Sequence, residues 1–231
     1  MGGVPMRRVG AAGAVAFIVL NIIAFGIIGS EPKYGASPTK IAKYFADNHK
    51  AILVAVVLLG LGLALLVGAI AQCADMLRSV GFPDAATAFA VAGGVLVAIL
   101  GIATGILGSM SQMAKNGADP GTLRVFYMAA QFIVSVPAAW IGPLLVVPLA
   151  RVSLSGALPR WVAQVNGLLA VLLVLGGIAV RGSGVLAVGT GAFATLANIA
   201  FVLLFLEVAA LLWRTAPAGS TFVHPAAAAP V

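Results

Sequence analysis

Charged residues are scarce in this sequence. Only 8% of its 231 residues are Asp, Glu, Lys or Arg, whereas a soluble globular domain carries roughly 25%. Hydrophobic residues make up 62% of the chain, and the mean hydropathy is +1.14. So few polar groups cannot cover a surface exposed to water. We therefore expect lipid to surround most of the chain.

Cysteine and histidine are nearly missing as well. Cys73 is the one cysteine, so an intrachain disulfide is excluded, and its place at the end of an apolar stretch predicts a passive buried thiol. His49 and His224 both lie outside the apolar stretches, which excludes a transmembrane haem held by two histidines and a Cys/His zinc cluster. We expect no cofactor, no metal and no enzymatic activity.

The net charge of +7 does not indicate nucleic-acid binding. The cations are scattered over the joints between apolar stretches, and no basic stripe interleaved with aromatic residues is present. Cations beside membrane spans are better explained by lipid headgroups.

Six long apolar stretches fill the rest of the chain, each 21 to 26 residues long by its bounds: 9–29, 51–72, 86–109, 124–149, 161–181 and 190–213. About 20 residues cross a bilayer as a helix, and these stretches lack the alternation of barrel strands. They predict an all-α polytopic bundle of six transmembrane helices over residues 1–214. Residues 215–231 form a Pro/Ala-rich tail that we expect to be disordered.

The first stretch resembles a signal sequence, because Arg7 and Arg8 precede it. It is long, however, and no small-x-small cleavage site follows Gly29, which predicts an uncleaved first span. An even number of spans places both termini on one side of what we expect to be a bacterial plasma membrane.

The orientation is not decided by counting cations. One side receives six of them: Arg7, Arg8, Arg78, Arg151, Arg160 and Arg214. The other side receives seven: Lys33, Lys40, Lys43, Lys50, Lys115, Arg124 and Arg181. The positive-inside rule does not separate such counts, so only the Arg pair before the first span favours a cytoplasmic N-terminus.

The longest joint, 30–50, contains signals for a short helix. Ser37 is a good N-cap and Pro38 a good first helical residue. Ile41, Tyr44 and Phe45 then recur at helical spacing, which predicts an amphipathic helix lying in the membrane interface with its aromatic side chains at headgroup depth. Two lysines on its other faces are expected to meet anionic lipid headgroups: Lys40 and Lys43.

The third stretch carries a column of small residues at helical spacing: Ala90, Gly94, Ala98, Gly101, Gly105 and Gly108. Small residues let helix backbones approach closely. The column predicts tight packing inside the chain rather than dimerisation.

The fourth stretch contains Pro137, Pro143 and Pro148. Proline removes a backbone donor and kinks a helix, so the first two predict an irregular span. We expect Pro148, near the end of the stretch, to terminate it.

Glu207 is the only acid within any of the six stretches. It lies roughly 8 Å past the centre of the last stretch, at 1.5 Å of rise per residue. Asn166 has a matching depth on the preceding antiparallel span, which makes it the predicted partner. Two interpretations stay open: a structural tie between a protonated Glu207 and Asn166, or a functional carboxylate.

Asn198 lies nine residues before Glu207, on the opposite side of the same helix, and both polar groups should avoid lipid. It shares its half of the membrane with Asn21, Gln131 and Ser135, and these side chains are candidates for a second polar layer. The candidate polar site in the membrane thus consists of five residues: Glu207, Asn166, Asn198, Asn21 and Gln131.

The segment from Ser37-Pro38 to Asn48, and Leu158-Pro159-Arg160-Trp161 at the start of a Leu/Gly-rich fifth span, resemble one group of proteins. These are uncharacterised bacterial six-span membrane proteins that share a domain of unknown function. The resemblance implies the six-span fold and no activity.

Three functions remain open. The small number of polar residues favours a non-enzymatic membrane component: an accessory subunit, a sensor or a scaffold. The second is a small-solute or proton-coupled transporter that uses Glu207. The third, an enzyme acting on lipids, lacks an acid/base cluster at either interface.

Overall fold

The structure is a computed structural model that describes residues 6–178, 188 and 191–215. The described part is helical, in the following order: α1 (Met6–Ile28), α2 (Pro38–Asp47), α3 (His49–Ser79), α4 (Pro83–Lys115), α5 (Pro120–Ser135), α6 (Pro137–Leu154), α7 (Arg160–Gly177) and α8 (Ala192–Arg214). Six segments of this part are long and apolar enough to cross a membrane, if α5 and α6 are taken together. The predicted all-α bundle with six membrane-length helices is confirmed.

The helices extend beyond some of the predicted spans. The 31 residues of α3 measure about 46 Å, which exceeds the ~30 Å of hydrocarbon in a bilayer. The apolar pattern reports only the lipid-facing part of such a helix, whereas its polar last turn also keeps helical hydrogen bonds. Residue 190, residues 179–181 of the fifth predicted span and residues 216–231 of the predicted tail lie outside the described residues.

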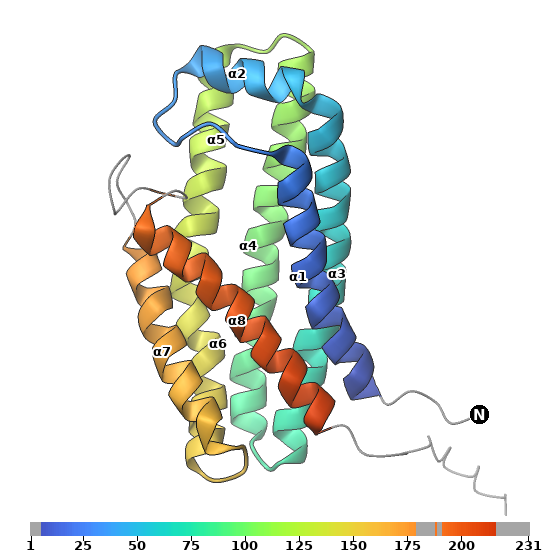
Figure 1. Ribbon diagram of the computed structural model, residues 1–231, viewed down its shortest axis with the longest axis vertical. Coiled ribbons are helices and arrows are strands. Elements are labelled where there is room, and N and C mark those ends of the chain that lie inside the picture. The colour runs from blue at the N-terminus through green and yellow to red at the C-terminus, as the bar shows by residue number, and fades with distance from the viewer. Residues whose placement is uncertain (1–5, 179–187, 189–190, 216–231) are drawn as a thin grey trace, which may run out of the picture.

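The spanning helices form a closed ring. α1 packs against α3 and α8, α3 against α4, α4 against α5 and α6, α6 against α7, and α7 against α8. Figure 1 shows α8 running obliquely from the end of α7 to the start of α1. Helix α8 thus has α7 and α1 as its main neighbours.

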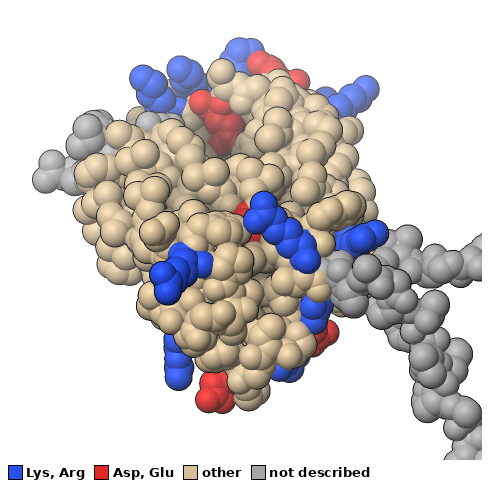
Figure 2. Space-filling view, turned by 60° about the horizontal axis from the view of Figure 1, so that its bottom comes forward, with Lys and Arg blue, Asp and Glu red and all other residues tan. Residues whose placement is uncertain are grey.

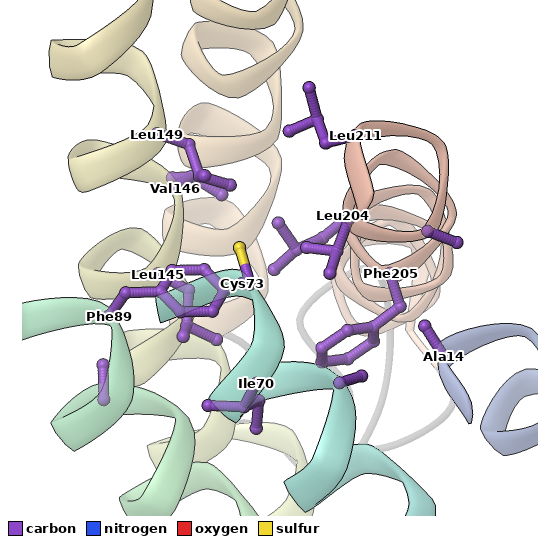
Figure 3. Close-up of a cluster of buried hydrophobic side chains, with 14 of the residues drawn as sticks. Ala14, Ile70, Cys73, Phe89, Leu145, Val146, Leu149, Leu204, Phe205 and Leu211 are labelled. Atoms are coloured by element: carbon purple, nitrogen blue, oxygen red, sulfur yellow. The ribbon is translucent and has the colours of Figure 1, made fainter. Parts of the chain in front are cut away.

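The larger hydrophobic core fills the part of the bundle that contains α7 and α8. Figure 3 shows its centre, where Leu204 and Phe205 of α8 lie beside Cys73 of α3, Phe89 of α4 and Leu145 of α6. Cys73 is fully buried, as its sequence position predicts. A second core lies at the opposite end, beneath α2.

The helix predicted after the first span is present as α2. Ser37 Oγ accepts a hydrogen bond from the Lys40 backbone N–H at 3.4 Å, and Pro38 is the first helical residue. Phe45 of α2 is 1% exposed and packs against Tyr127 of α5, so its ring faces the bundle. The apolar face of α2 covers the end of the bundle, because that face fits the open tops of α4 and α5 (Figure 1).

The prediction for the small residues of the third span is wrong in part. Gly94, Ala98 and Gly105 of α4 are exposed, and a Cβ placed on Gly94 or Gly105 would meet nothing within 4 Å. The glycine that packs closely is Gly93, where a Cβ would lie 2.6 Å from Ile70 Cγ2. Gly94, Ala98 and Gly105 therefore face outward, and the closest approach of α3 and α4 occurs beside them, at Gly93.

The fourth span is irregular, as its prolines predict. Helix α5 ends at Ser135 and α6 begins at Pro137, with Val136 between them at φ −99° and ψ −63°. The prediction for Pro148 is wrong, because α6 continues through it to Leu154. Within α6, Pro143 and Pro148 are both tolerated inside the helix.

Charged side chains gather at the ends of the bundle. Figure 2 shows broad uncharged areas between the blue and red groups. The start of α1 and the end of α8 meet at one end, where Arg7 Nη1 donates a hydrogen bond to the Thr215 backbone oxygen at 2.7 Å. The same end holds Arg8, whose guanidinium lies 5.3 Å from the centroid of the Trp213 ring.

Candidate intramembrane polar site

Glu207 and Asn166 are in direct contact. Asn166 Nδ2 donates a hydrogen bond to Glu207 Oε1 at 2.7 Å and lies 2.8 Å from the Val162 backbone oxygen. Asn166 is 1% and Glu207 5% exposed. The contact predicted from depth on antiparallel spans is confirmed, because α7 and α8 pack directly against each other.

The surroundings of this pair are apolar. Leu204 and Leu211, which precede and follow Glu207 on α8, are buried in the same core as Cys73. Arg214, the nearest cation along the sequence, is exposed and lies over the ring of Trp161, 5.9 Å from its centroid. Among the described residues, the carboxyl of Glu207 therefore has an amide as its hydrogen-bond partner and no cation.

Two buried oxygen atoms of the pair lack a donor. Asn166 Oδ1 and Glu207 Oε2 accept no hydrogen bond from the described residues. Both are acceptors, whereas a protonated carboxylic acid has an O–H donor. An acid proton on Glu207 would supply the donor that this site needs, and an ionised Glu207 would leave a buried charge without a counter-charge. The arrangement can therefore hold a proton.

The other candidate residues do not form the second polar layer. Asn21 Nδ2 donates to the Phe17 backbone oxygen of its own helix at 2.8 Å, and Asn198 is exposed on α8. Gln131 bonds to Glu31 instead, and no contact of Ser135 with these side chains is among the described hydrogen bonds. Equal depth was not enough, because Asn198 faces outward and the main packing partners of α1 are α3 and α8, not α5.

A second carboxyl withdrawn from water, that of the partly buried Glu31, was missed by the sequence analysis. It lies in the joint between α1 and α2, which passes beneath α2 toward α5 (Figure 1). Gln131 Nε2 donates to Glu31 Oε2 at 2.6 Å, and Tyr127 Oη lies 3.4 Å from the same oxygen. Tyr127 Oη also donates to the Pro32 backbone oxygen. The joint is thus fastened to α5.

Burial controls the chemistry of Glu31. Loss of solvent raises the pKa of its carboxyl above the ordinary value, while the bonds from Tyr127 and Gln131 act in the opposite direction and are weaker. Burial, and then the negative charge of Glu31, raise the pKa of Tyr44 on α2. The sequence contains one indication of this contact. Glu31 follows the end of the first predicted span, and Gln131 lies near the start of the fourth, at the same face of the membrane.

The remaining acids form no reactive cluster in the described part of the chain. Asp75 Oδ1 forms an ion pair with Arg78 at 2.7 Å, and Asp119 caps α5 by accepting from the Thr122 backbone N–H at 2.8 Å. Asp84 occupies the first turn of α4. Within residues 6–178, 188 and 191–215, no group of three or more His, Cys, Asp or Glu could hold a metal ion.

Comparison with known proteins identifies no relative. No protein-family model matches the chain, and neither the curated proteins nor the solved structures contain a match.

Proposed function

We propose that this protein is a non-enzymatic component of the membrane: an accessory subunit, a sensor or a scaffold. The observation that supports it is the closed pair of Glu207 and Asn166. The one carboxyl within the predicted spans is buried, bonded to an amide on the neighbouring helix, and surrounded by leucines. Such a carboxyl holds α7 against α8 and need not take part in a reaction.

The alternative is a small-solute or proton-coupled transporter that uses Glu207. It is supported by the two oxygen atoms without a donor, which suit a proton that comes and goes. A carrier also needs a path of polar groups. Asn21, Gln131 and Asn198 bond elsewhere or face outward, which counts against such a path.

The test compares the unfolding of detergent-purified Glu207→Leu and Glu207→Gln with that of the unaltered protein. Leucine leaves Asn166 without its partner and should lower the unfolding free energy by ~1–2 kcal/mol. Glutamine keeps an acceptor and supplies a donor for Asn166 Oδ1, so its cost should be smaller. Asn198→Leu is the matched control on the same helix, because Asn198 is exposed. Equal or greater stability of Glu207→Leu would contradict the structural tie and support the transporter.

A second experiment addresses transport directly. Proteoliposomes with a pH-sensitive dye inside should show the same proton leak for the unaltered protein and Glu207→Gln. A leak that disappears in Glu207→Gln would overturn the proposal.

The proposal also includes the cellular location of the protein and the side of the membrane on which its termini lie. We place the protein in a bacterial plasma membrane with both termini in the cytoplasm and without a nucleic-acid partner. The Arg pair at the start of α1 and the meeting of α1 with the end of α8 support this. The resemblance to uncharacterised bacterial six-span proteins is consistent with it and adds no activity.

A further inference from the structure

A pocket lies where α2 meets α3, at the end of the bundle covered by α2. Its volume is about 350 Å³, and it is lined by Ala46, Asp47, Asn48, His49, Lys50, Ala51 and Lys115. Lys50 lies in the first turn of α3, and Lys115 is the last residue of α4. The antiparallel packing of these two consecutive helices thus brings two lysines that are far apart in the sequence to one pocket.

The pocket is positively charged. Lys50 and Lys115 are exposed and form no ion pair with the described residues. Asp47 is the one acid in the lining, and it is paired with Lys43 at 2.8 Å. With this acid neutralised, the charge of the two lysines is available to an anion.

His49 is held in place at the wall of the pocket. Its Nδ1 lies 3.0 Å from Ser111 Oγ, and Ser111 Oγ donates to the His49 backbone oxygen at 3.3 Å. Ser111 is fully buried on α4, so this pair fixes the start of α3 against the end of α4. The two lysines are therefore presented by rigid elements rather than by a loop.

On each helix, the lysine lies at the end of a row of residues that recur at steps of seven and lie on nearly the same side of the helix. Lys115 lies seven residues after Gly108, which lies seven after Gly101, and a step of seven residues returns to nearly the same side of a helix. Lys50 likewise precedes the exposed Val57 and Ala64 at steps of seven. The surface below both lysines is thus apolar and faces lipid.

The glycine column of α4 lies beside Val56 and Leu63 of α3, and we call the strip of surface over these glycines, where side chains are missing, the groove. A Cβ on Gly108 would lie 3.5 Å from Val56 Cγ1, and one on Gly101 would lie 4.0 Å from Leu63 Cδ1, so the glycines adjoin α3. A Cβ on Gly105 would meet nothing within 4 Å, which leaves the outer side open. From Gly108 to Gly94 the groove extends about 21 Å, more than the ~15 Å of hydrocarbon in one leaflet.

We propose that this pocket and groove bind an anionic phospholipid, with the phosphate headgroup between Lys50 and Lys115 and an acyl chain along the glycines of α4. Charge complementarity places the headgroup, because two unpaired lysines and the first turn of α3 favour negative charge. The missing side chains of Gly101 and Gly105 make room for the acyl chain. The inference is independent of the role of Glu207, and it moves the headgroup site expected at Lys40 and Lys43 to the other side of the α2–α3 junction.

The test measures the melting temperature of the full chain in detergent with added phosphatidylglycerol or with phosphatidylcholine of the same acyl chains. A ligand that binds the folded state stabilises it. We expect phosphatidylglycerol to raise the melting temperature by about 2–4 °C more than phosphatidylcholine. The double variant Lys50→Gln/Lys115→Gln should lose this difference, whereas Lys33→Gln/Lys40→Gln, with two exposed lysines outside the pocket lining, should keep it.

The acyl chain is tested by Gly105→Leu, which fills the groove, with Gly26→Leu as the control at another exposed glycine of open surroundings. Gly105→Leu should lose the preference for phosphatidylglycerol, and Gly26→Leu should keep it. Each comparison between lipids is made within one variant, so a change in its basal stability cancels.

Three results would overturn the proposal. The two lipids could stabilise the unaltered protein equally, or Lys50→Gln/Lys115→Gln could keep the full difference. Inorganic phosphate alone could also reproduce the shift while Gly105→Leu leaves it intact, which would show a site for free anions instead of lipid.

Discussion

At the scale of single residues, two carboxyl groups are withdrawn from water in different ways. Glu207 lies among leucines with one amide partner on the neighbouring helix. Glu31 lies in a joint and reaches an amide and a phenol on α5. In each case a carboxyl joins its own segment to another helix, and neither carboxyl has a cation as hydrogen-bond partner in the described structure.

The pair of Glu207 and Asn166 should behave as one unit. Asn166→Leu and Glu207→Leu each leave the other side chain without its partner, so the double variant should cost less than the sum of the two single variants. We expect an interaction energy of ~0.6–2 kcal/mol from the cycle of unfolding free energies in detergent. Additive costs would show that the hydrogen bond contributes nothing to stability.

Glu31 should make the stability depend on pH. Its folded-state pKa is raised, so the folded protein binds this proton more tightly than the unfolded chain does. The contribution is fully present below the ordinary pKa near 4.5 and is lost as the pH rises through the raised value. The decline above pH 4.5 should be smaller in Glu31→Gln, whereas Asp84→Asn, at an exposed acid, should retain it in full. The same decline in Glu31→Gln would assign it to another group.

At the scale of helices, the position of each glycine relative to its neighbours matters more than its spacing. Gly93, Gly142 and Gly176 face a neighbouring helix so closely that a Cβ would displace side chains of Ile70, Leu173 or Ala197. The regularly spaced small residues Gly94, Ala98 and Gly105 of α4 lie outside these contacts. Close approach of helices in this bundle therefore depends on glycines that do not form the most regular pattern.

Gly176→Ala should destabilise the protein, because the added methyl group would overlap Ala197 and approach the Phe193 backbone oxygen to 3.3 Å. We expect a loss of ~1–3 kcal/mol in unfolding free energy, as for other overpacked sites. Gly105→Ala is the matched control: it meets open space and should be neutral or stabilising by up to ~1 kcal/mol, since alanine favours helix. Equal effects of the two substitutions would contradict the packing of α7 against α8.

At the scale of the whole molecule, the ring of helices has two ends of different composition. Arginines surround the end where α1 begins and α8 finishes, and lysines predominate at the end covered by α2. The described joints between the spanning helices alternate between these ends, as a multi-pass protein requires.

Cysteine labelling in membranes tests this alternation. In a Cys73→Ala background, Asp84→Cys and Thr215→Cys should react with a membrane-impermeant reagent from one side. Asn116→Cys, at the opposite end of α4, should react from the other side. Reaction of Asp84→Cys and Asn116→Cys from the same side would show that α4 does not cross the membrane.

The sequence alone determined the number of spans, the helix after the first span and the contact of Glu207 with Asn166. Hydropathy sets the depth of a residue along its helix, and the order of antiparallel spans makes neighbours of equal depth meet. Ser37 and Pro38 determine the start of α2 locally, without help from the rest of the chain.

Only the tertiary structure decided which way each helix face points. In lipid, inward and outward faces are both apolar, so a sequence pattern does not distinguish them. That is why regularly spaced small residues of α4 proved to face outward and why Asn198 proved to be exposed. The fold of the joint also brought Glu31 to Gln131, and the packing of α3 against α4 brought Lys50 to Lys115, because these contacts depend on the rotation of whole helices about their axes.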